Sequence, residues 1–227
     1  MKLKLLSGNQ LKVLAAILMT IDHIGVMIFT QSEILRIIGR LSMPVFSYMI
    51  SEGAHHTKNR KKYLFTMIVI SFILQTVYYF ALQSLSQCIL VTFSLAIALI
   101  YVYDYAKKRN DITGFFFFGF SLFTVYFLTV ILPVILKKTD YNIDYGFFGV
   151  ILPLLIYIGK NKTQKLLMLT SGLVLVSLTN SPIQWYSLLS VPIIALYNEK
   201  RGRLKMKNFF YIFYPLHLLV IYFISNL

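Results

Sequence analysis

The chain has 227 residues, of which 58% are apolar and 13% are charged, about half the charged fraction of a soluble domain. Its formal net charge of +14 would suit a nucleic-acid partner, but the Lys and Arg residues stand in short groups between long apolar runs, as they do in membrane proteins. Composition therefore excludes an ordinary soluble domain and argues against nucleic-acid binding. The lone Cys88 excludes an internal disulfide and a Cys-based metal site.

Apolar runs of about the length needed to cross a bilayer recur along the whole chain. They predict an all-α fold, a polytopic transmembrane helix bundle with about nine spans that forms a single integral membrane domain. The runs at 145–159, 165–179 and 182–197 are short, so the alternatives are a count of eight spans or two re-entrant segments among these three. The predicted spans are 11–29, 34–51, 63–82, 88–106, 114–136, 145–159, 165–179, 182–197 and 208–226.

The distribution of basic residues predicts the direction of the bundle. If the N-terminus is cytoplasmic, 18 of the 22 Lys and Arg residues fall on the cytoplasmic side, whereas the outer connections hold only Lys137 and Lys138. Because positive charge is retained on the cytoplasmic side of a membrane, this asymmetry predicts a multi-pass protein of the plasma membrane with its N-terminus inside.

The first span carries two ionisable residues, Asp22 and His23, well inside its apolar run. A charged side chain at mid-membrane costs roughly 2.5–3.5 kcal/mol on insertion scales, so such a residue indicates a functional site with a partner on another helix. At about 1.5 Å per residue, His23 lies about 9 Å below the outer boundary, and Arg40 of the second span lies at about the same depth. Arg36 is one turn from Arg40 on the same face. With His217 of the last span, these residues are expected to converge in one buried polar pocket.

The adjacent residues Asp22 and His23 point about 100° apart on a helix and therefore do not pair with each other. We expect Asp22 to neutralise Arg36 or Arg40 while His23 faces a cavity. There a neutral imidazole can take a proton from an attacking amine or hydroxyl, or accept an acyl group itself. The alternative is a structural Asp22–Arg40 ion pair with His23 as a hydrogen-bonding core residue.

Two further groups stand out. Glu52, His55 and His56 close the second span at its inner end; their spacing fits no standard set of metal ligands, so we expect no metal there and instead donors suited to a phosphorylated cofactor. In the last span, Tyr211, Tyr214 and His217 recur every three residues along one face, and Pro215 interrupts the helix. At the start of the sixth span, Gly146 and Gly149 are expected to permit a close approach between helices.

Five stretches, spread from one end of the chain to the other, carry a resemblance: LKVLAAILMTIDHIG (11–25), LRIIGRLSMPVFSYMISEG (35–53), DYGFFGV (144–150), LLSVPIIALYNEKRG (188–202) and FFYIFYPLHLLVIY (209–222). Together they resemble the TraX family of polytopic membrane proteins, which is named for the enzyme that N-acetylates F-type conjugative pilin. The resemblance implies that His23 is a catalytic histidine, supported by Asp22, Arg36, Arg40 and His217.

Taken with these residues, the resemblance implies an integral membrane acyltransferase, most simply an acetyltransferase. It would take acetyl-CoA from the cytoplasm and modify an amine or hydroxyl of an unidentified extracytoplasmic peptide, lipid or glycan. The alternative is a small membrane transporter or an immunity-type binding protein, although the chain lacks the repeated halves common in transporters. Candidate contacts to the acceptor or to the cofactor and its phosphates are Arg36, Glu52, His55, Arg60, Lys61, Lys62, Asp144, Asn198, Lys200, Arg201, Arg203, Tyr211 and Tyr214.

Overall fold

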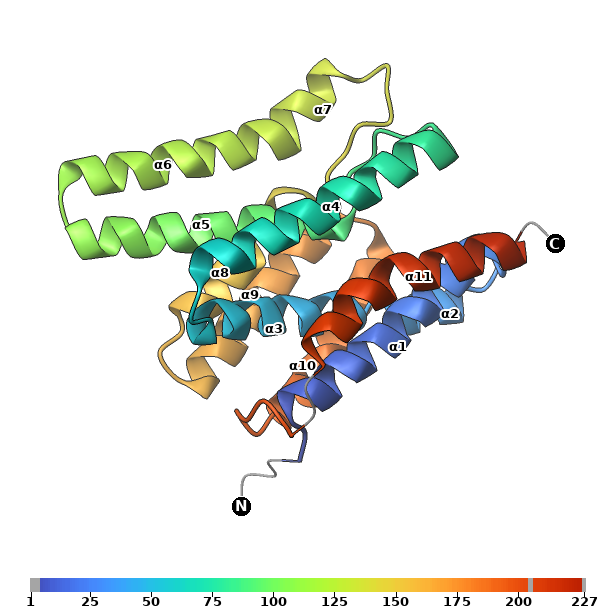
Figure 1. The fold of residues 1–227 in the computed structure, drawn as a ribbon, viewed down its shortest axis with the longest axis horizontal. Helices are drawn as coiled ribbons and strands as arrows, with labels where there is room; N and C mark the ends of the chain where they lie inside the picture. The colour runs from blue at the N-terminus through green and yellow to red at the C-terminus, as the bar shows by residue number, and fades with distance from the viewer. Residues whose placement is uncertain (1–4, 204–205, 226–227) are drawn as a thin grey trace. The chain divides into compact units, whose positions relative to one another are not determined.

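The computed structural model describes residues 5–203 and 206–225, with side chains throughout except at 81–82 and 207–211. Each of the nine predicted apolar runs lies on helix, and within the described ranges strand pairing is limited to two isolated bridges, so the all-α prediction is confirmed. The elements, shown in Figure 1, are α1 Gly8–Met27, α2 Glu33–Gly39, α3 Ser42–His56, α4 Arg60–Leu82, α5 Ile89–Arg109, α6 Ile112–Tyr126, the π-helical turn η1 Phe127–Ile131, α7 Leu132–Ile135, α8 Gly146–Ile158, α9 Lys162–Thr179, the 3₁₀ helix η2 Pro182–Leu189, α10 Ser190–Ala195 and α11 Lys207–Ser225.

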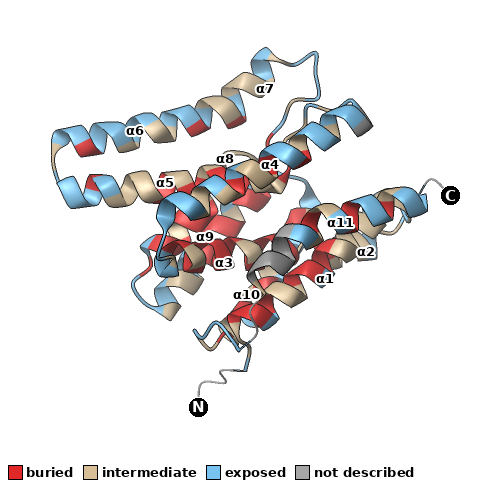
Figure 2. Cartoon of the chain, viewed as in Figure 1, coloured by how far each residue is buried: buried red, intermediate tan, exposed pale blue. Residues whose placement is uncertain are grey.

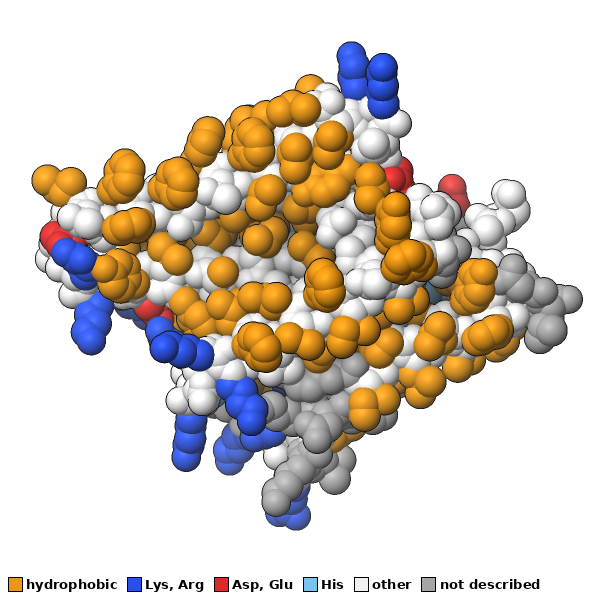
Figure 3. All heavy atoms as spheres, turned by 45° about the horizontal axis from the view of Figure 1, so that its top comes forward, with side chains coloured by type: hydrophobic (Ala, Val, Ile, Leu, Met, Phe, Trp, Pro, Cys, Tyr) orange, Lys and Arg blue, Asp and Glu red, His pale blue; other side chains and the backbone are white. Residues whose placement is uncertain are grey.

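Within the part of the chain that the structure describes, five helical segments are long and apolar enough to cross a membrane. The apolar side chains of Arg60–Phe80 and Ile112–Ile135 are largely exposed, as lipid-facing surfaces are, whereas those of Glu33–His56 and Ile89–Arg109 are more often buried. Figure 3 shows many exposed hydrophobic side chains, with Lys and Arg in separate groups. The five segments are Gly8–Met27, Glu33–His56, Arg60–Phe80, Ile89–Arg109 and Ile112–Ile135.

The second predicted span is not one continuous helix, because α2 ends at Gly39 and α3 begins at Ser42. Pro44 explains the break. In an unbroken helix the backbone N–H of residue 44 would bond the carbonyl of Arg40, but proline has no N–H and its ring clashes with that carbonyl. The chain instead restarts at Ser42, whose hydroxyl donates to the backbone carbonyl of Ala15 at 2.9 Å. Proline then lies in a first turn, where it is tolerated.

Contacts between residues divide the chain into two compact units. The first comprises 1–49 and 169–227. Within it α1 packs against α2 and α11, and the segment before α1 is hydrogen-bonded to the segment after α10. The N–H groups of Gly8 and Asn9 donate to the carbonyls of Lys200 and Arg201 at 2.8 and 2.9 Å. The start of α1 and the basic connection after α10 therefore lie at the same end of this unit.

The second unit comprises 50–168 and is built around α5, which contacts α4, α6 and α8. Its core contains Ala96, Leu99 and Ile100 of α5 packed with Val150 and Leu154 of α8. Figure 2 shows the contrast between these largely buried helices and α6, which is mostly exposed. Within this unit the outer apolar surface of α6 is therefore left uncovered, as a lipid-facing surface would be.

At the end of this second unit where α4 ends and α5 begins, Asp140 joins two connections. Its carboxylate accepts hydrogen bonds from the Ser84 hydroxyl at 2.5 Å and the Leu85 N–H at 2.9 Å. These bonds hold the pKa of the Asp140 carboxyl below its usual range, because they favour the ionised form. The connection at 83–88 and the connection that follows α7 therefore lie together.

The expected close helix approach at Gly146 and Gly149 is wrong. A Cβ at Gly146 would meet open space, and one at Gly149 would overlap the side chain of Tyr145 from the preceding turn, not another helix. Gly146 has a positive φ of 58°, and Tyr145 before it has a φ of 62°. These glycines therefore shape the entry to α8, where two successive residues are left-handed.

Candidate functional site

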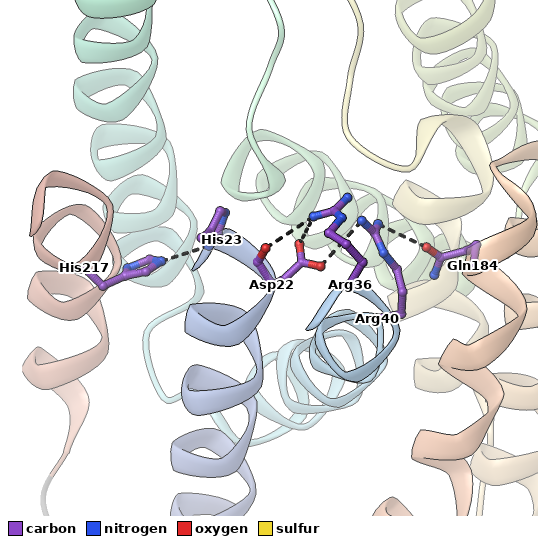
Figure 4. Close-up of polar contacts among 6 residues, drawn as sticks. All are labelled: Asp22, His23, Arg36, Arg40, Gln184 and His217. Atoms are coloured by element: carbon purple, nitrogen blue, oxygen red, sulfur yellow. Dashed lines mark hydrogen bonds and ion pairs between the residues drawn. The ribbon is translucent and has the colours of Figure 1, made fainter. Parts of the chain in front are cut away.

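Asp22 forms ion pairs with both arginines of the second apolar segment (Figure 4). Arg36 Nη1 lies 2.8 Å from Asp22 Oδ2, and Arg40 Nη2 lies 3.5 Å from Asp22 Oδ1. All three side chains are mostly buried, with 18% of Asp22, 28% of Arg36 and 12% of Arg40 exposed. The predicted pairing of Asp22 is therefore found with both partners, because residues four apart on α2 share one face.

Two glycines let α1 and α2 approach closely enough for this pairing. A Cβ at Gly39 would overlap the Asp22 side chain, and a Cβ at Gly25 would lie 2.8 Å from the Cβ of Leu35. A larger residue at either position would push the helices apart. The absence of a side chain at position 39 therefore creates the space that the carboxylate occupies.

Gln184 joins the same cluster and was not anticipated from the sequence. It lies on η2, is 1% exposed, and its Oε1 accepts a hydrogen bond from Arg40 Nη1 at 3.5 Å. Its Nε2 is buried without a hydrogen-bond partner among the described residues, as is Nε of Arg40. An amide inside the apolar run 182–197 is the same signal that singled out Asp22, and applying it there would have found Gln184. We call Asp22, Arg36, Arg40 and Gln184 the buried ion-pair group.

The histidines of α1 and α11 contact each other directly. His217 Nε2 lies 3.2 Å from His23 Nδ1, and His217 Nδ1 lies 2.9 Å from the backbone carbonyl of Phe213. The Phe213 ring stacks on His217 with centroids 5.0 Å apart, and the Tyr214 ring meets it edge-on at 5.5 Å. His217 is buried and held from three directions.

This geometry assigns the ring protons of the neutral pair. A carbonyl only accepts hydrogen bonds, so Nδ1 of His217 carries its proton and Nε2 is the acceptor. His23 must then donate from Nδ1 to Nε2 of His217. In that tautomer Nε2 of His23 carries a lone pair, which is the atom that a general base or an acyl carrier uses.

The second unit holds a basic pocket of about 520 Å³ at the ends of α4 and α5. Arg60 is the predicted residue in it: its Nη2 lies 2.6 Å from Asp104 Oδ2, and its guanidinium lies over the Tyr101 ring at 5.1 Å. The Tyr157 hydroxyl also donates to Asp104 at 2.6 Å. With three cations and one carboxylate, the pocket suits an anionic ligand. Its lining residues are Arg60, Tyr101, Asp104, Tyr105, Lys107 and Lys108.

His55 and Glu52 lie in this second unit, each with a defined partner. The His55 ring stacks on the Tyr157 ring with centroids 3.9 Å apart, and His55 Nε2 lies 3.1 Å from the Tyr157 carbonyl. Glu52 is buried and accepts a hydrogen bond from Lys165 Nζ at 2.5 Å. His55 therefore steadies a residue that orients Asp104, while Glu52 joins α3 to α9.

The remaining candidates that the structure describes are exposed or have other partners. Lys61 and Lys62 are exposed on the first turn of α4, and the side chain of Tyr211 lies outside the described residues. Asp144 accepts a hydrogen bond at its backbone carbonyl from Thr92, and the Asn198 side chain accepts one from the Lys200 N–H. Arg201 and Arg203 are exposed, and the Arg201 carbonyl accepts a hydrogen bond from Asn9. Among the described residues, no three His, Cys, Asp or Glu side chains gather as metal ligands would.

Comparison with known proteins gives a family match and two relatives. The family model described as "TraX protein" matches residues 7–225. The chain is 33% identical to "Uncharacterized protein RP591" of Rickettsia prowazekii over 69% of its length, and that match spans 57% of the relative. It is 26% identical to "Probable fimbrial assembly protein FimC, serogroup H1" of Dichelobacter nodosus over 93% of both proteins. No solved structure matches the chain.

Proposed function

The chain belongs to the TraX family, and from this premise we propose that it is an integral membrane acyltransferase that moves an acetyl group from acetyl-CoA to an extracytoplasmic amine or hydroxyl. The observation that carries the proposal is the His23–His217 contact at 3.2 Å, with His217 Nδ1 bonded to the Phe213 carbonyl. The contact fixes one tautomer of His23 and leaves its Nε2 lone pair available to a substrate, which supports a role as base or acyl carrier.

The topology we propose has nine crossings, a cytoplasmic N-terminus and a location in the plasma membrane. Within the second unit, the basic connection before α4 and the basic end of α5 lie together, since Arg60 shares a pocket with Lys107 and Lys108. The connection at 83–88 lies with the one that follows α7 at Asp140. This alternation of ends supports the sidedness inferred from basic residues.

We assign the phosphates of coenzyme A to the basic pocket. Arginine and lysine are the residues that proteins use for phosphate, and Tyr101 and Tyr105 offer rings on which an adenine can stack. Asp104 and Tyr157 hold the Arg60 guanidinium in position through contacts of 2.6 Å each on the carboxylate. Arg201 and its basic neighbours are proposed as further contacts on the cytoplasmic side.

The proposed reaction is a direct acyl transfer. The acceptor nitrogen or oxygen attacks the thioester carbonyl carbon while His23 Nε2 removes its proton, and the C–S bond then breaks. The coenzyme A thiolate leaves and takes that proton from His23, so the products are an acetylated acceptor and the free thiol. The same lone pair can instead attack the thioester carbonyl carbon; the C–S bond then breaks, the acetyl group stays on Nε2, and the acceptor later displaces Nε2 and gives its proton to the coenzyme A thiolate. In either route His217 holds His23 in the useful tautomer.

The relative named as a fimbrial assembly protein suggests the kind of acceptor. We propose that the acceptor is a molecule destined for the cell surface, of which a pilus subunit is one example. Mass spectrometry of surface peptides, lipids and glycans from cells with and without this protein would identify it, because a single species would differ by one acetyl group.

The test of the proposed function uses the purified protein in detergent, acetyl-CoA and a membrane extract as the source of acceptor. We expect release of free coenzyme A, and we expect His23→Gln to reduce it by about 10²–10⁴-fold, the usual contribution of a general base. The matched control is His56→Gln, since the His56 side chain is 75% exposed and does not line the basic pocket to which coenzyme A is assigned. A folded His23→Gln protein that turns over at the wild-type rate would remove His23 from the mechanism.

A further inference from the structure

The buried ion-pair group carries more positive than negative charge. Two guanidinium groups face one carboxylate, so with Asp22 ionised there is one cation in excess. Arg40 is only 12% exposed and Arg36 28%. An uncompensated charge inside an apolar environment is costly, so a stable site of this kind calls for an anion.

Hydrogen-bond donors are also in excess. Each guanidinium offers five N–H donors; Nη1 of Arg36 and Nη1 of Arg40 make hydrogen bonds, and Nη2 of Arg40 faces Asp22 Oδ1 at 3.5 Å, an acceptor that has no hydrogen bond of its own among the described residues. Arg40 Nε and Gln184 Nε2 are both buried with no partner among the described residues. Ser187 Oγ is likewise unpaired, and it lies three residues after Gln184 on a 3₁₀ helix, which places both on one side of η2. Buried donors without acceptors are rare in proteins.

The position of the group within its unit indicates which ligand brings the anion. Asp22 lies near the end of α1, whereas the start of α1 is hydrogen-bonded to the basic connection at 198–201. In the proposed topology that connection is cytoplasmic, so the buried ion-pair group lies toward the outer side. Coenzyme A is cytoplasmic, whereas the acceptor is not.

We propose that Arg36, Arg40 and Gln184 bind an oxyanion, a carboxylate or a phosphate, carried by the acceptor. The planar fork of arginine matches the two oxygens of such a group, and the free amide N–H₂ of Gln184 supplies a further donor. The assignment of the oxyanion to the acceptor rests on the proposed acyl transfer, but the existence of an anion site does not. The enzyme would then select amines or hydroxyls that stand near a negative charge.

The experiment measures thermal unfolding of the purified full-length protein in a non-ionic detergent, with no acetyl-CoA present. Sodium acetate, inorganic phosphate and dioctanoyl phosphatidylglycerol are each compared with chloride at equal ionic strength. At ten times the dissociation constant, an oxyanion that binds only the folded protein should raise the midpoint by about 3–6 °C. The probe that acts identifies the source as a carboxylate, a soluble phosphate or a lipid headgroup. No response to any of the three would overturn the proposal.

The decisive variant is Gln184→Glu, which supplies a built-in carboxylate beside Arg40. It should unfold at a higher temperature than the wild type in chloride and gain nothing further from an oxyanion. Gln164→Glu, the same change at an exposed position, should respond like the wild type. If Gln184→Glu does not fold, Arg40→Lys keeps the charge but loses the fork, and should weaken oxyanion binding about tenfold or more. The proposal is wrong if folded Gln184→Glu or folded Arg40→Lys shows the same oxyanion-induced rise in unfolding temperature as the wild type.

The two proposals fail separately. Coenzyme A release with no oxyanion response would leave the acyltransferase standing without this site. An oxyanion response with no coenzyme A release would leave a membrane anion site without acyl transfer.

Discussion

The role of His217 can be separated from that of His23 by a pair of substitutions at position 217. His217 Nε2 lies 3.2 Å from His23 Nδ1, and the Phe213 carbonyl keeps the other ring nitrogen protonated. His217→Phe fills the space but removes the acceptor. His217→Gln places an amide oxygen near the position of Nε2 and can still accept from His23.

The expected magnitude follows from the single hydrogen bond that is lost. A neutral hydrogen bond contributes about 0.5–1.5 kcal/mol, and 1.36 kcal/mol is tenfold in rate, so His217→Phe should slow coenzyme A release by about 2–13-fold. His217→Gln should retain most of the activity. Both losses are far smaller than the loss expected for His23→Gln, since His217 acts through His23 and is a positioning residue.

The assay is the release of coenzyme A under saturating acetyl-CoA, with circular dichroism to confirm that each variant is folded. The reasoning is refuted if His217→Phe is as inactive as His23→Gln, because His217 would then be a base in its own right. It is also refuted if His217→Gln is no better than His217→Phe, because the acceptor at that position would not matter.

Three further predictions concern packing, the basic pocket and pH. Gly39→Ala should destabilise the protein by about 1–3 kcal/mol and impair transfer, since its Cβ would overlap Asp22, whereas Gly119→Ala should be neutral in thermal unfolding, since a Cβ there meets nothing within 4 Å. Lys108→Gln should weaken coenzyme A binding by up to about fivefold in calorimetry, while Lys138→Gln should not; equal affinities would remove Lys108 from the donor site. The pKa of Asp140 is lowered by its bonds to Ser84 and Leu85, so its contribution to the free energy of unfolding is complete above the unfolded pKa of about 4 and is lost as pH falls through the folded pKa. In that pH range the Leu85 amide should lose protection against hydrogen exchange, and Asp140→Asn should abolish this pH dependence.

Hydropathy and charge in the sequence predicted much of the fold. All nine apolar runs are helical, and α1, α4 and α5 begin or end within a few residues of the expected limits. The break at Arg40 was missed because a window average does not register a single proline. Pro44 has no N–H to bond the carbonyl of Arg40, so this proline alone would have predicted the break.

The buried ion-pair group was partly predictable. Asp22, Arg36 and Arg40 stand out because ionisable residues are rare in apolar runs, and their depths matched. Gln184 is uncharged and was overlooked, although its burial is nearly complete. Which nitrogen of His23 is free was beyond the sequence, since it depends on the Phe213 carbonyl and the orientation of His217.

Only a small part of the basic pocket was predictable from the sequence. Arg60 was expected from its place in a cluster of basic residues, but its neighbours Lys61 and Lys62 point to solvent. The residues that complete the pocket come from the far end of α5, where Asp104 and Lys108 are forty or more positions away in sequence. Contacts between the start of α4 and the end of α5 depend on how the two helices pack, and no periodic pattern in the sequence reveals them.

The exposed apolar surface of α6 has a practical consequence. Only Gly114 and Val125 of this helix are buried, while most of its phenylalanines face outward. One side of α6 packs on α5, and the exposed side calls for hydrocarbon rather than water. In the proposed membrane location lipids would cover that exposed side, and lipid nanodiscs would supply them.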